Sequence, residues 1–165
     1  MTDTVLVTYG TTNGSTAEIA QAVTEILRQA GLTVESRPAR SATNVARYDA
    51  VVVGGGLYAG RWHKDARRFV RRNRVLLAER PVWFFSSGPL DPSASERDIP
   101  PVRGVQRDMT RLDVRDHVTF GGCLEEGAKG WVAGMILRSG KGGDFRDFGA
   151  IEAWAGDIAG ALTHA

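Results

Sequence analysis

The sequence predicts an α/β fold: a three-layer, doubly wound sandwich around a five-stranded parallel sheet. Short apolar runs rich in β-branched residues alternate with amphipathic helical segments along the chain, which is typical of folds built on a parallel sheet. The 165 residues suit one domain, since a chain of this length can bury a sizeable core and no linker divides it. We therefore treat residues 1–165 as a single domain.

The first half of the chain supplies three of the expected strands. The first is Thr4–Thr8, and the second, Leu32–Arg37, is weaker and suits a sheet edge. The third is the continuous run Asp49–Gly54, as expected for a central strand covered on both faces. Between the first two strands, apolar residues fall on one helical face, and Gly31 is placed to end that helix. These residues are Ile19, Ala20, Val23, Ile26, Leu27 and Ala30.

The second half completes the pattern. A basic helix with Ala66, Phe69, Val70 and Leu77 as inner positions precedes a fourth strand, Pro81–Phe85. A helix from Val102 to Leu112, a fifth strand at His117–Gly121 and a C-terminal helix at Ile151–Leu162 follow. A plain five-stranded fold needs far fewer residues between the fifth strand and the last helix. Residues 124–149, which contain Trp131–Leu137, are therefore an insertion.

The net charge of +2 is concentrated in residues 61–74, where seven basic residues accompany one acid, Asp65. Such a segment attracts acidic groups, such as carboxylates, anionic lipid headgroups or an acidic protein, or it is simply a solvated helix face. Residues 129–141 combine lysine and arginine with an apolar patch, and we weigh a lid, a membrane contact and a homodimer interface for them. We expect no nucleic-acid partner.

The cysteine count and the N-terminus bear on the compartment. One cysteine, Cys123, excludes an intramolecular disulfide framework and a cysteine-cluster zinc site. No basic leader precedes the first strand, and no apolar run approaches the roughly 20 residues of a membrane span. We expect a cytoplasmic protein without a signal peptide, with peripheral contact at the inner membrane face as one option.

The strongest chemical signal lies between the first strand and the first helix. The loop consists of Thr11, Thr12, Asn13, Gly14, Ser15 and Thr16, and it contains no lysine or arginine. A nucleoside triphosphatase loop requires Gly-Lys-Ser/Thr, whereas Gly14 is followed by Ser15, so the sequence does not favour that class. A neutral nest of hydroxyls and amides at a helix N-terminus suits a terminal monophosphate. The structural alternative is a capping box, in which Ser15 caps the helix and Glu18 completes the motif.

A second glycine-rich stretch, Gly54–Ala59, matches the dinucleotide pattern G-x-G-x-x-A. A dinucleotide site needs an acid at the end of the next strand to bind the ribose. That strand ends in Phe85-Ser86-Ser87, without an acid. The pattern therefore carries little weight for a dinucleotide.

The loop Thr11–Thr16 resembles the Ser/Thr-x-Thr-Gly-x-Thr phosphate loop of the flavodoxin family. The resemblance spans nearly the whole chain and implies FMN as cofactor and the strand order 2-1-3-4-5, with the ligand beyond the carboxyl ends of the strands. It also implies that two further loops flank the flavin. The cofactor-binding candidates in these loops are Leu57, Tyr58, Ala59 and Gly60, and Ser86, Ser87, Gly88, Pro89 and Leu90. For Trp62, packing and flavin contact remain alternatives.

Within that superfamily, residues 54–63, the insertion and the run 139–143 are similar to the menaquinone-dependent protoporphyrinogen oxidases. This resemblance implies an FMN-dependent oxidoreductase of heme biosynthesis that oxidises protoporphyrinogen IX and passes electrons to a quinone. His63, directly after the flavin loop, is the candidate catalytic residue, as a proton carrier. The alternatives are a flavodoxin-type electron-transfer shuttle without its own substrate, and a flavin-free interaction protein. No metal-ligand spacing occurs in the sequence.

Overall fold

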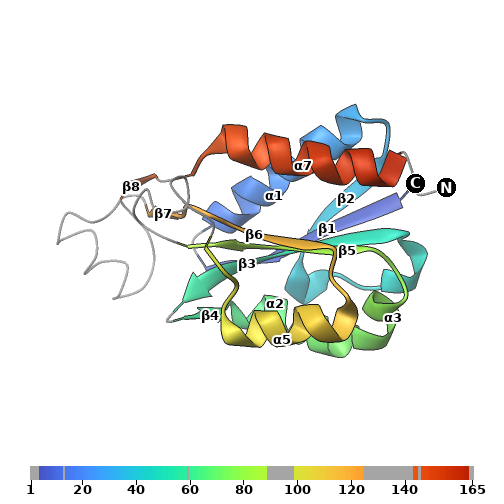
Figure 1. Cartoon of the computed structure of the whole chain (residues 1–165), viewed down its shortest axis with the longest axis horizontal. Coiled ribbons are helices and arrows are strands. Elements are labelled where there is room, and N and C mark those ends of the chain that lie inside the picture. The colour runs from blue at the N-terminus through green and yellow to red at the C-terminus, as the bar shows by residue number, and fades with distance from the viewer. Residues whose placement is uncertain are drawn as a thin grey trace.

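A five-stranded parallel sheet forms the centre of the computed structural model, which describes residues 4–12, 14–58, 60–88, 99–124, 143–144 and 146–163. Its strand order is β2-β1-β3-β5-β6, the expected 2-1-3-4-5 (Figure 1). The strands are β1 (Thr4–Gly10), β2 (Thr33–Pro38), β3 (Ala50–Tyr58), β5 (Val82–Ser87) and β6 (Asp116–Phe120). The predicted fold class and strand order are confirmed.

A short sixth strand was not predicted. This strand, β4 (Arg61–Trp62), turns back from the end of β3 and pairs with it antiparallel, so that Leu57 lies opposite Trp62. Gly60, with a φ of 74°, makes the tight reversal possible. The β3–β4 hairpin thus extends the sheet at the edge where parallel α/β folds bind ligands.

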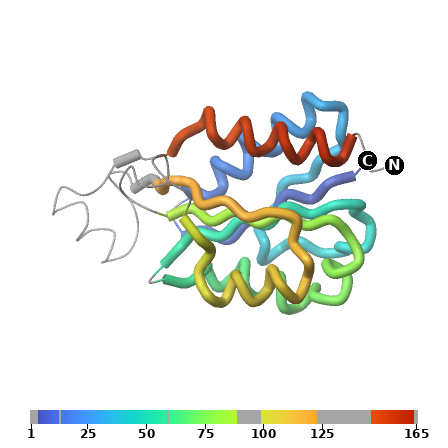
Figure 2. Tube along the Cα trace, in the orientation of Figure 1, coloured from blue at the N-terminus to red at the C-terminus, as the bar shows by residue number. Residues whose placement is uncertain are grey.

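Helices cover both faces of the sheet (Figure 1). On one face lie α1 (Ser15–Gln29) and α7 (Phe148–Thr163), and on the other lie α2 (Lys64–Arg72), α3 (Arg74–Ala78) and α5 (Arg103–Leu112). Two 3₁₀ turns, η1 (Ala39–Ser41) and η2 (Val45–Arg47), connect β2 to β3. The trace in Figure 2 shows that β1 begins and α7 ends at the same end of the molecule.

The two cores follow from alternation along the strands. On the α1/α7 face, Phe85 packs against Phe120 and Trp154, with ring centroids 6.0 Å away in both cases. On the α2/α5 face, the neighbouring Phe84 packs on Trp62, with centroids 4.9 Å apart. Successive strand residues point to opposite faces of the sheet, so each strand contributes side chains to both cores.

Glycines within β3 make room for these aromatic rings. A Cβ on Gly54 would lie 2.1 Å from the Phe85 ring, and one on Gly55 would lie 2.6 Å from the Trp62 ring. The glycine-rich stretch is therefore strand rather than a phosphate-binding loop, because Gly54 and Gly55 pair with Phe85 and Ser86. This placement removes the dinucleotide interpretation.

The basic segment forms two helices instead of one. Its four predicted inner residues are all buried, as expected from their spacing. The helix is interrupted at Asn73, between α2 and α3. The Asn73 side-chain Nδ2 donates a hydrogen bond to the carbonyl of Phe69. A backbone carbonyl in the last turn of α2 thus has its hydrogen-bond partner in a side chain rather than in a further turn of helix.

The insertion lies largely outside the described residues, including Trp131–Leu137 and the segment 129–141. At its edges, β7 (Cys123–Leu124) and β8 (Gly143–Asp144) pair antiparallel. Among the described residues, no helix combines the length and apolar character needed to cross a bilayer.

Candidate functional site

The carboxyl ends of β1, β3 and β5 meet at one edge of the sheet, and the loop after β1 leads directly into α1. Within this loop, the Thr11 hydroxyl accepts a hydrogen bond from the Gly14 amide at 3.2 Å. Gly14 has a φ of 86°, a left-handed conformation that suits glycine and turns the chain into the helix. The loop is therefore held in shape by the Thr11 side chain and by the left-handed turn at Gly14.

The N-terminus of α1 has no side-chain cap. Gly14 is the capping residue and Ser15 is already helical, so the predicted capping box is wrong. Glu18 instead contacts Arg146, whose Nη1 lies 2.6 Å from a Glu18 carboxylate oxygen. The first amides of an α-helix have no partner within the helix, and they carry the positive end of its dipole. This helix start is thus available to an anion.

Thr16, in the first turn of α1, is the residue that points most directly to a ligand. Its side chain is 1% exposed, and its hydroxyl has no hydrogen-bond partner among the described residues. A Cβ built on Gly56 would lie 3.1 Å from this hydroxyl, so β3 approaches it closely. A buried hydroxyl without a partner costs about 1–3 kcal/mol, which a bound acceptor would recover.

Tyr58 links the end of β3 to the same loop. Its hydroxyl accepts a hydrogen bond from the Thr12 amide at 3.0 Å. The ring meets His63 edge-on, with centroids 5.7 Å apart, and is 38% exposed. The phenol therefore occupies one donor of the loop that a phosphate would also use.

His63 begins α2. Its Nδ1 accepts a hydrogen bond from the Asp65 amide at 3.1 Å, and its backbone amide donates to Gly56 at 2.7 Å. Burial lowers the pKa of the imidazole, so the neutral form that accepts this bond is favoured. His63 is thus a helix cap beside the loop, and its catalytic role stays a prediction.

A buried hydrogen-bond chain underlies the β3–β4 hairpin. The Trp62 indole donates to the Ser86 hydroxyl at 2.8 Å, and that hydroxyl lies 2.8 Å from Nε2 of His117 on β6. The indole is a donor only, so the Ser86 proton is free to point to a neutral His117. Burial lowers the pKa of His117 to about 4. The chain thus connects the hairpin, through Trp62, to Ser86 on β5 and His117 on β6.

The sequence analysis did not predict that His117 takes part in this hydrogen-bond chain. The available signal was a histidine that opens a strand whose neighbours are apolar, a setting in which a buried imidazole needs a polar partner. Its partner could not be read from the sequence, because the register that brings β6 beside β5 is a tertiary property.

The remaining predicted residues lie at the ends of β3 and β5. The Gly88 amide donates to the Phe120 carbonyl at 3.0 Å, and a Cβ on Gly88 would lie 2.8 Å from Leu57. Ser87 is buried as the last residue of β5. Asn13, Ala59, Pro89 and Leu90 lie outside the described residues. The site residues taken together stay a prediction, although the structure brings Thr12, Gly56, Tyr58 and Thr16 together.

A family model described as a flavodoxin domain matches residues 6–137. The chain belongs to the flavodoxin domain family. FMN is the cofactor that this membership assigns. A comparison with curated proteins finds no match.

Solved structures share the fold of this flavodoxin domain. A flavodoxin from the domain Archaea is 13% identical with a TM-score of 0.64, covering 98% of this chain and 99% of that one. A flavodoxin from Streptococcus pneumonia TIGR4 is 16% identical with a TM-score of 0.63, covering 96% and 99%. Rubredoxin oxygen:oxidoreductase from Desulfovibrio gigas is 14% identical with a TM-score of 0.64, covering 98% of this chain but 36% of that one.

The residues present fit the phosphate of FMN. The uncapped start of α1, the buried hydroxyl of Thr16 and the Thr12 amide are all donors. A phosphate accepts hydrogen bonds and prefers the positive end of a helix dipole. The part of the chain that the structure describes holds no group of three or more histidine, cysteine or acidic side chains placed for a metal.

Proposed function

We propose that this flavodoxin domain is an FMN-dependent oxidoreductase. The observation that supports it best is the buried Thr16 hydroxyl, which lies at the uncapped start of α1 without a partner among the described residues. When bound, FMN supplies reversible transfer of one or two electrons. The chain would hold the phosphate with neutral donors, and Tyr58 at the β3–β4 hairpin contacts the same loop.

The test replaces two buried hydroxyls that both lack a partner among the described residues. Thr16→Val removes the hydroxyl at the loop, and we expect FMN affinity to fall about tenfold, the loss of one hydrogen bond to a charged group. Thr8→Val is the matched control, because Thr8 is fully buried in β1 and its hydroxyl is equally unpaired. We expect the control to change FMN affinity by less than about twofold.

Quenching of flavin fluorescence on titration into apoprotein measures both affinities. Neither variant should lose stability, because valine replaces a hydroxyl that makes no bond in the apoprotein. Equal FMN affinity in the wild type and both variants would remove Thr16 from the phosphate site.

Within this class, we propose protoporphyrinogen IX as electron donor and a quinone as acceptor. The similarity of residues 54–63 and of the insertion to menaquinone-dependent protoporphyrinogen oxidases supports this choice. His63 lies beside Tyr58, and with Nδ1 accepting from the Asp65 amide its ring proton is on Nε2. We propose that His63 carries a proton at Nε2 during the reaction.

The assay follows porphyrin fluorescence when FMN-loaded protein meets protoporphyrinogen and a menaquinone analogue. His63→Asn is the informative variant, because asparagine also caps helices well but does not titrate. We expect the wild type to exceed air oxidation and the variant to lose about tenfold in rate without losing FMN. Fluorescence at the air-oxidation level in the wild type would refute the substrate.

An electron-transfer shuttle is the second candidate. It is favoured by the match to single-domain flavodoxins over 99% of their own length. Here the FMN-loaded protein would carry electrons from a flavin reductase to cytochrome c and leave protoporphyrinogen untouched. One preparation of FMN-loaded protein can be assayed both for protoporphyrinogen oxidation and for reduction of cytochrome c, and so tests both candidates.

A further inference from the structure

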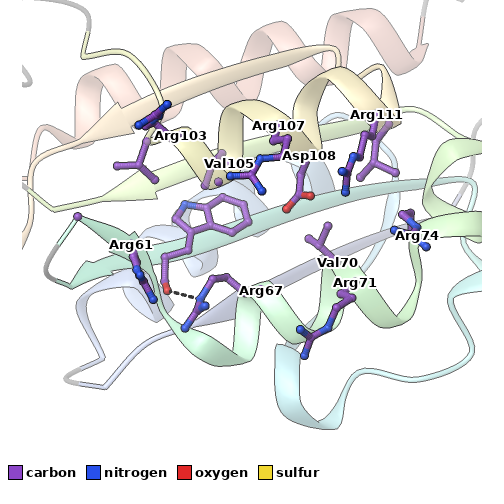
Figure 3. Close-up of a pocket in the computed structure, with 15 residues that line it drawn as sticks. Arg61, Arg67, Val70, Arg71, Arg74, Arg103, Val105, Arg107, Asp108 and Arg111 are labelled. Atoms are coloured by element: carbon purple, nitrogen blue, oxygen red, sulfur yellow. Dashed lines mark hydrogen bonds between the residues drawn. The ribbon is translucent and has the colours of Figure 1, made fainter.

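A second anion-directed feature lies on the α2/α5 face, away from the phosphate loop. It is a groove of about 540 Å³ between α2 and α5 (Figure 3). Apolar residues such as Val70, Val105 and Leu112 form part of its lining, and Asp108 is its one acidic residue. The lining also includes seven arginines: Arg61, Arg67, Arg71, Arg74, Arg103, Arg107 and Arg111. We refer to these residues as the arginine groove.

Five of the arginines form two rows, one on each of the helices that border the groove. Arg103, Arg107 and Arg111 are four residues apart on α5, which places one on each turn at intervals of about 6 Å. Arg67 and Arg71 repeat the same spacing on α2 across the groove (Figure 3). The groove therefore presents a regular ladder of positive charge.

These arginines have few partners within the protein. All seven are exposed, and no acidic side chain of the described residues lies within 4.0 Å of their guanidinium nitrogens. Arg67 donates to the Trp62 carbonyl at 3.0 Å, which fixes it at the groove wall. Asp108 interacts with the charges of Arg111, Arg107 and Arg74, although burial raises the pKa of its carboxyl. One acid offsets at most one of the seven positive charges. The positive charge is left to an external anion.

The groove starts beside the cofactor edge. Gly60, Arg61 and Trp62 of the β3–β4 hairpin line one end of it, and Tyr58 of the same hairpin contacts the phosphate loop. A partner held in the groove would therefore lie next to the proposed FMN site, as electron transfer requires.

We propose that the arginine groove docks an acidic segment of a protein redox partner. The proposal rests on the proposed FMN-dependent function and names the kind of partner that function uses. Glutamates at i and i+4 of a helix are about 6 Å apart, and alternate residues of an extended strand are about 6.6 Å apart. Both spacings match the arginine rows, and guanidinium groups bind carboxylates in bidentate fashion.

The lining argues against other polyanions. Single-stranded nucleic acids stack their bases on exposed aromatic rings, whereas Trp62, the one aromatic of the lining, is 2% exposed. A membrane surface favours exposed apolar side chains among the cations. The exposed large apolar residues of the described part of the chain, Tyr58, Val75 and Phe148, lie outside the groove.

The test measures binding of a fluorescein-labelled peptide of ten glutamates by fluorescence anisotropy at low salt. The groove variant is Arg107→Glu with Arg111→Glu. The matched control is Arg68→Glu with Arg72→Glu, which makes the same change in net charge at exposed positions of α2 outside the groove. We expect the groove variant to bind at least about tenfold more weakly and the control to stay within about threefold.

Three results would overturn the proposal. The first is equal weakening by the two pairs, since the effect would then be net charge alone. The second is tighter binding of a ten-nucleotide oligothymidylate than of the peptide, and the third is preferential binding to phosphatidylglycerol vesicles. FMN titration of the same variants separates this proposal from the proposed function, because the groove variants should take up FMN as the wild type does.

Discussion

The phosphate loop and the arginine groove attract anions by opposite means. The loop contains no lysine or arginine and relies on the start of α1, amides and the Thr16 hydroxyl. The groove relies on seven exposed arginines, beside the first turn of α5 that also lines it. Fixed donors select one small group in one geometry, whereas mobile cations accept many acidic surfaces. The difference separates cofactor binding from partner docking within one small domain.

The β3–β4 hairpin joins these two regions. Tyr58 contacts the loop, and Arg61 and Trp62 line the groove only a few residues later. The hydrogen bonds from Trp62 to Ser86 and between Ser86 and His117 connect the hairpin to β5 and β6. Perturbing these hydrogen bonds, or Tyr58, therefore tests how far the two regions are coupled.

The largest of these effects is expected from acidification. The pKa of His117 is lowered to about 4 in the folded protein, so the unfolded chain binds the proton more readily. The stability that His117 contributes is complete above its unfolded pKa near 6.5 and is lost as pH falls through the folded value near 4. We expect a loss of about 2 kcal/mol between pH 7.5 and pH 4.5, measured by urea unfolding.

The control for this experiment is His117→Gln, which keeps a hydrogen-bonding group but does not titrate. Carboxylates also titrate in this range, so the difference between wild type and variant isolates the histidine. Identical pH dependence in the two proteins would show that the pKa of His117 is not lowered in the folded protein.

A smaller effect is expected at Tyr58. Tyr58→Phe keeps the ring but removes the hydroxyl that now accepts from the Thr12 amide. The amide is then free for the phosphate, so we expect FMN to bind about threefold more tightly. Peptide binding at the arginine groove should not change. Weaker FMN binding by the variant would instead assign the phenol to the bound cofactor.

The sequence predicted the loop better than the groove. Loop residues are consecutive, and local rules for strand, turn and helix place Thr11–Thr16 at the start of α1. The groove needs Arg61–Arg74 to face Arg103–Arg111, which depends on how α5 packs beside α2. Only the first of these segments was recognised as a charged feature. Contacts between distant segments are set by tertiary packing, which periodicity does not report.

The glycines of β3 and the end of β5 show the same limit. Periodicity ended the third strand at Gly54, but pairing with β5 carries it to Gly56 and pairing with β4 carries it on to Tyr58. Ser86 and Ser87 were assigned to a loop, although they pair with Thr119 and Phe120 and are buried. Both errors arose because ladder hydrogen bonds with neighbouring strands, rather than local propensity, extend a strand.

The most direct test of the phosphate loop compares FMN with riboflavin, which lacks the phosphate, at 50 mM and 500 mM NaCl. We expect FMN to bind the apoprotein about a hundredfold more tightly, because several charge-assisted hydrogen bonds are lost with riboflavin. The ratio should change less than about threefold with salt, since buried fixed donors are screened little. Equal affinity for the two flavins, or a ratio that collapses at high salt, would contradict a cation-free phosphate site at the start of α1.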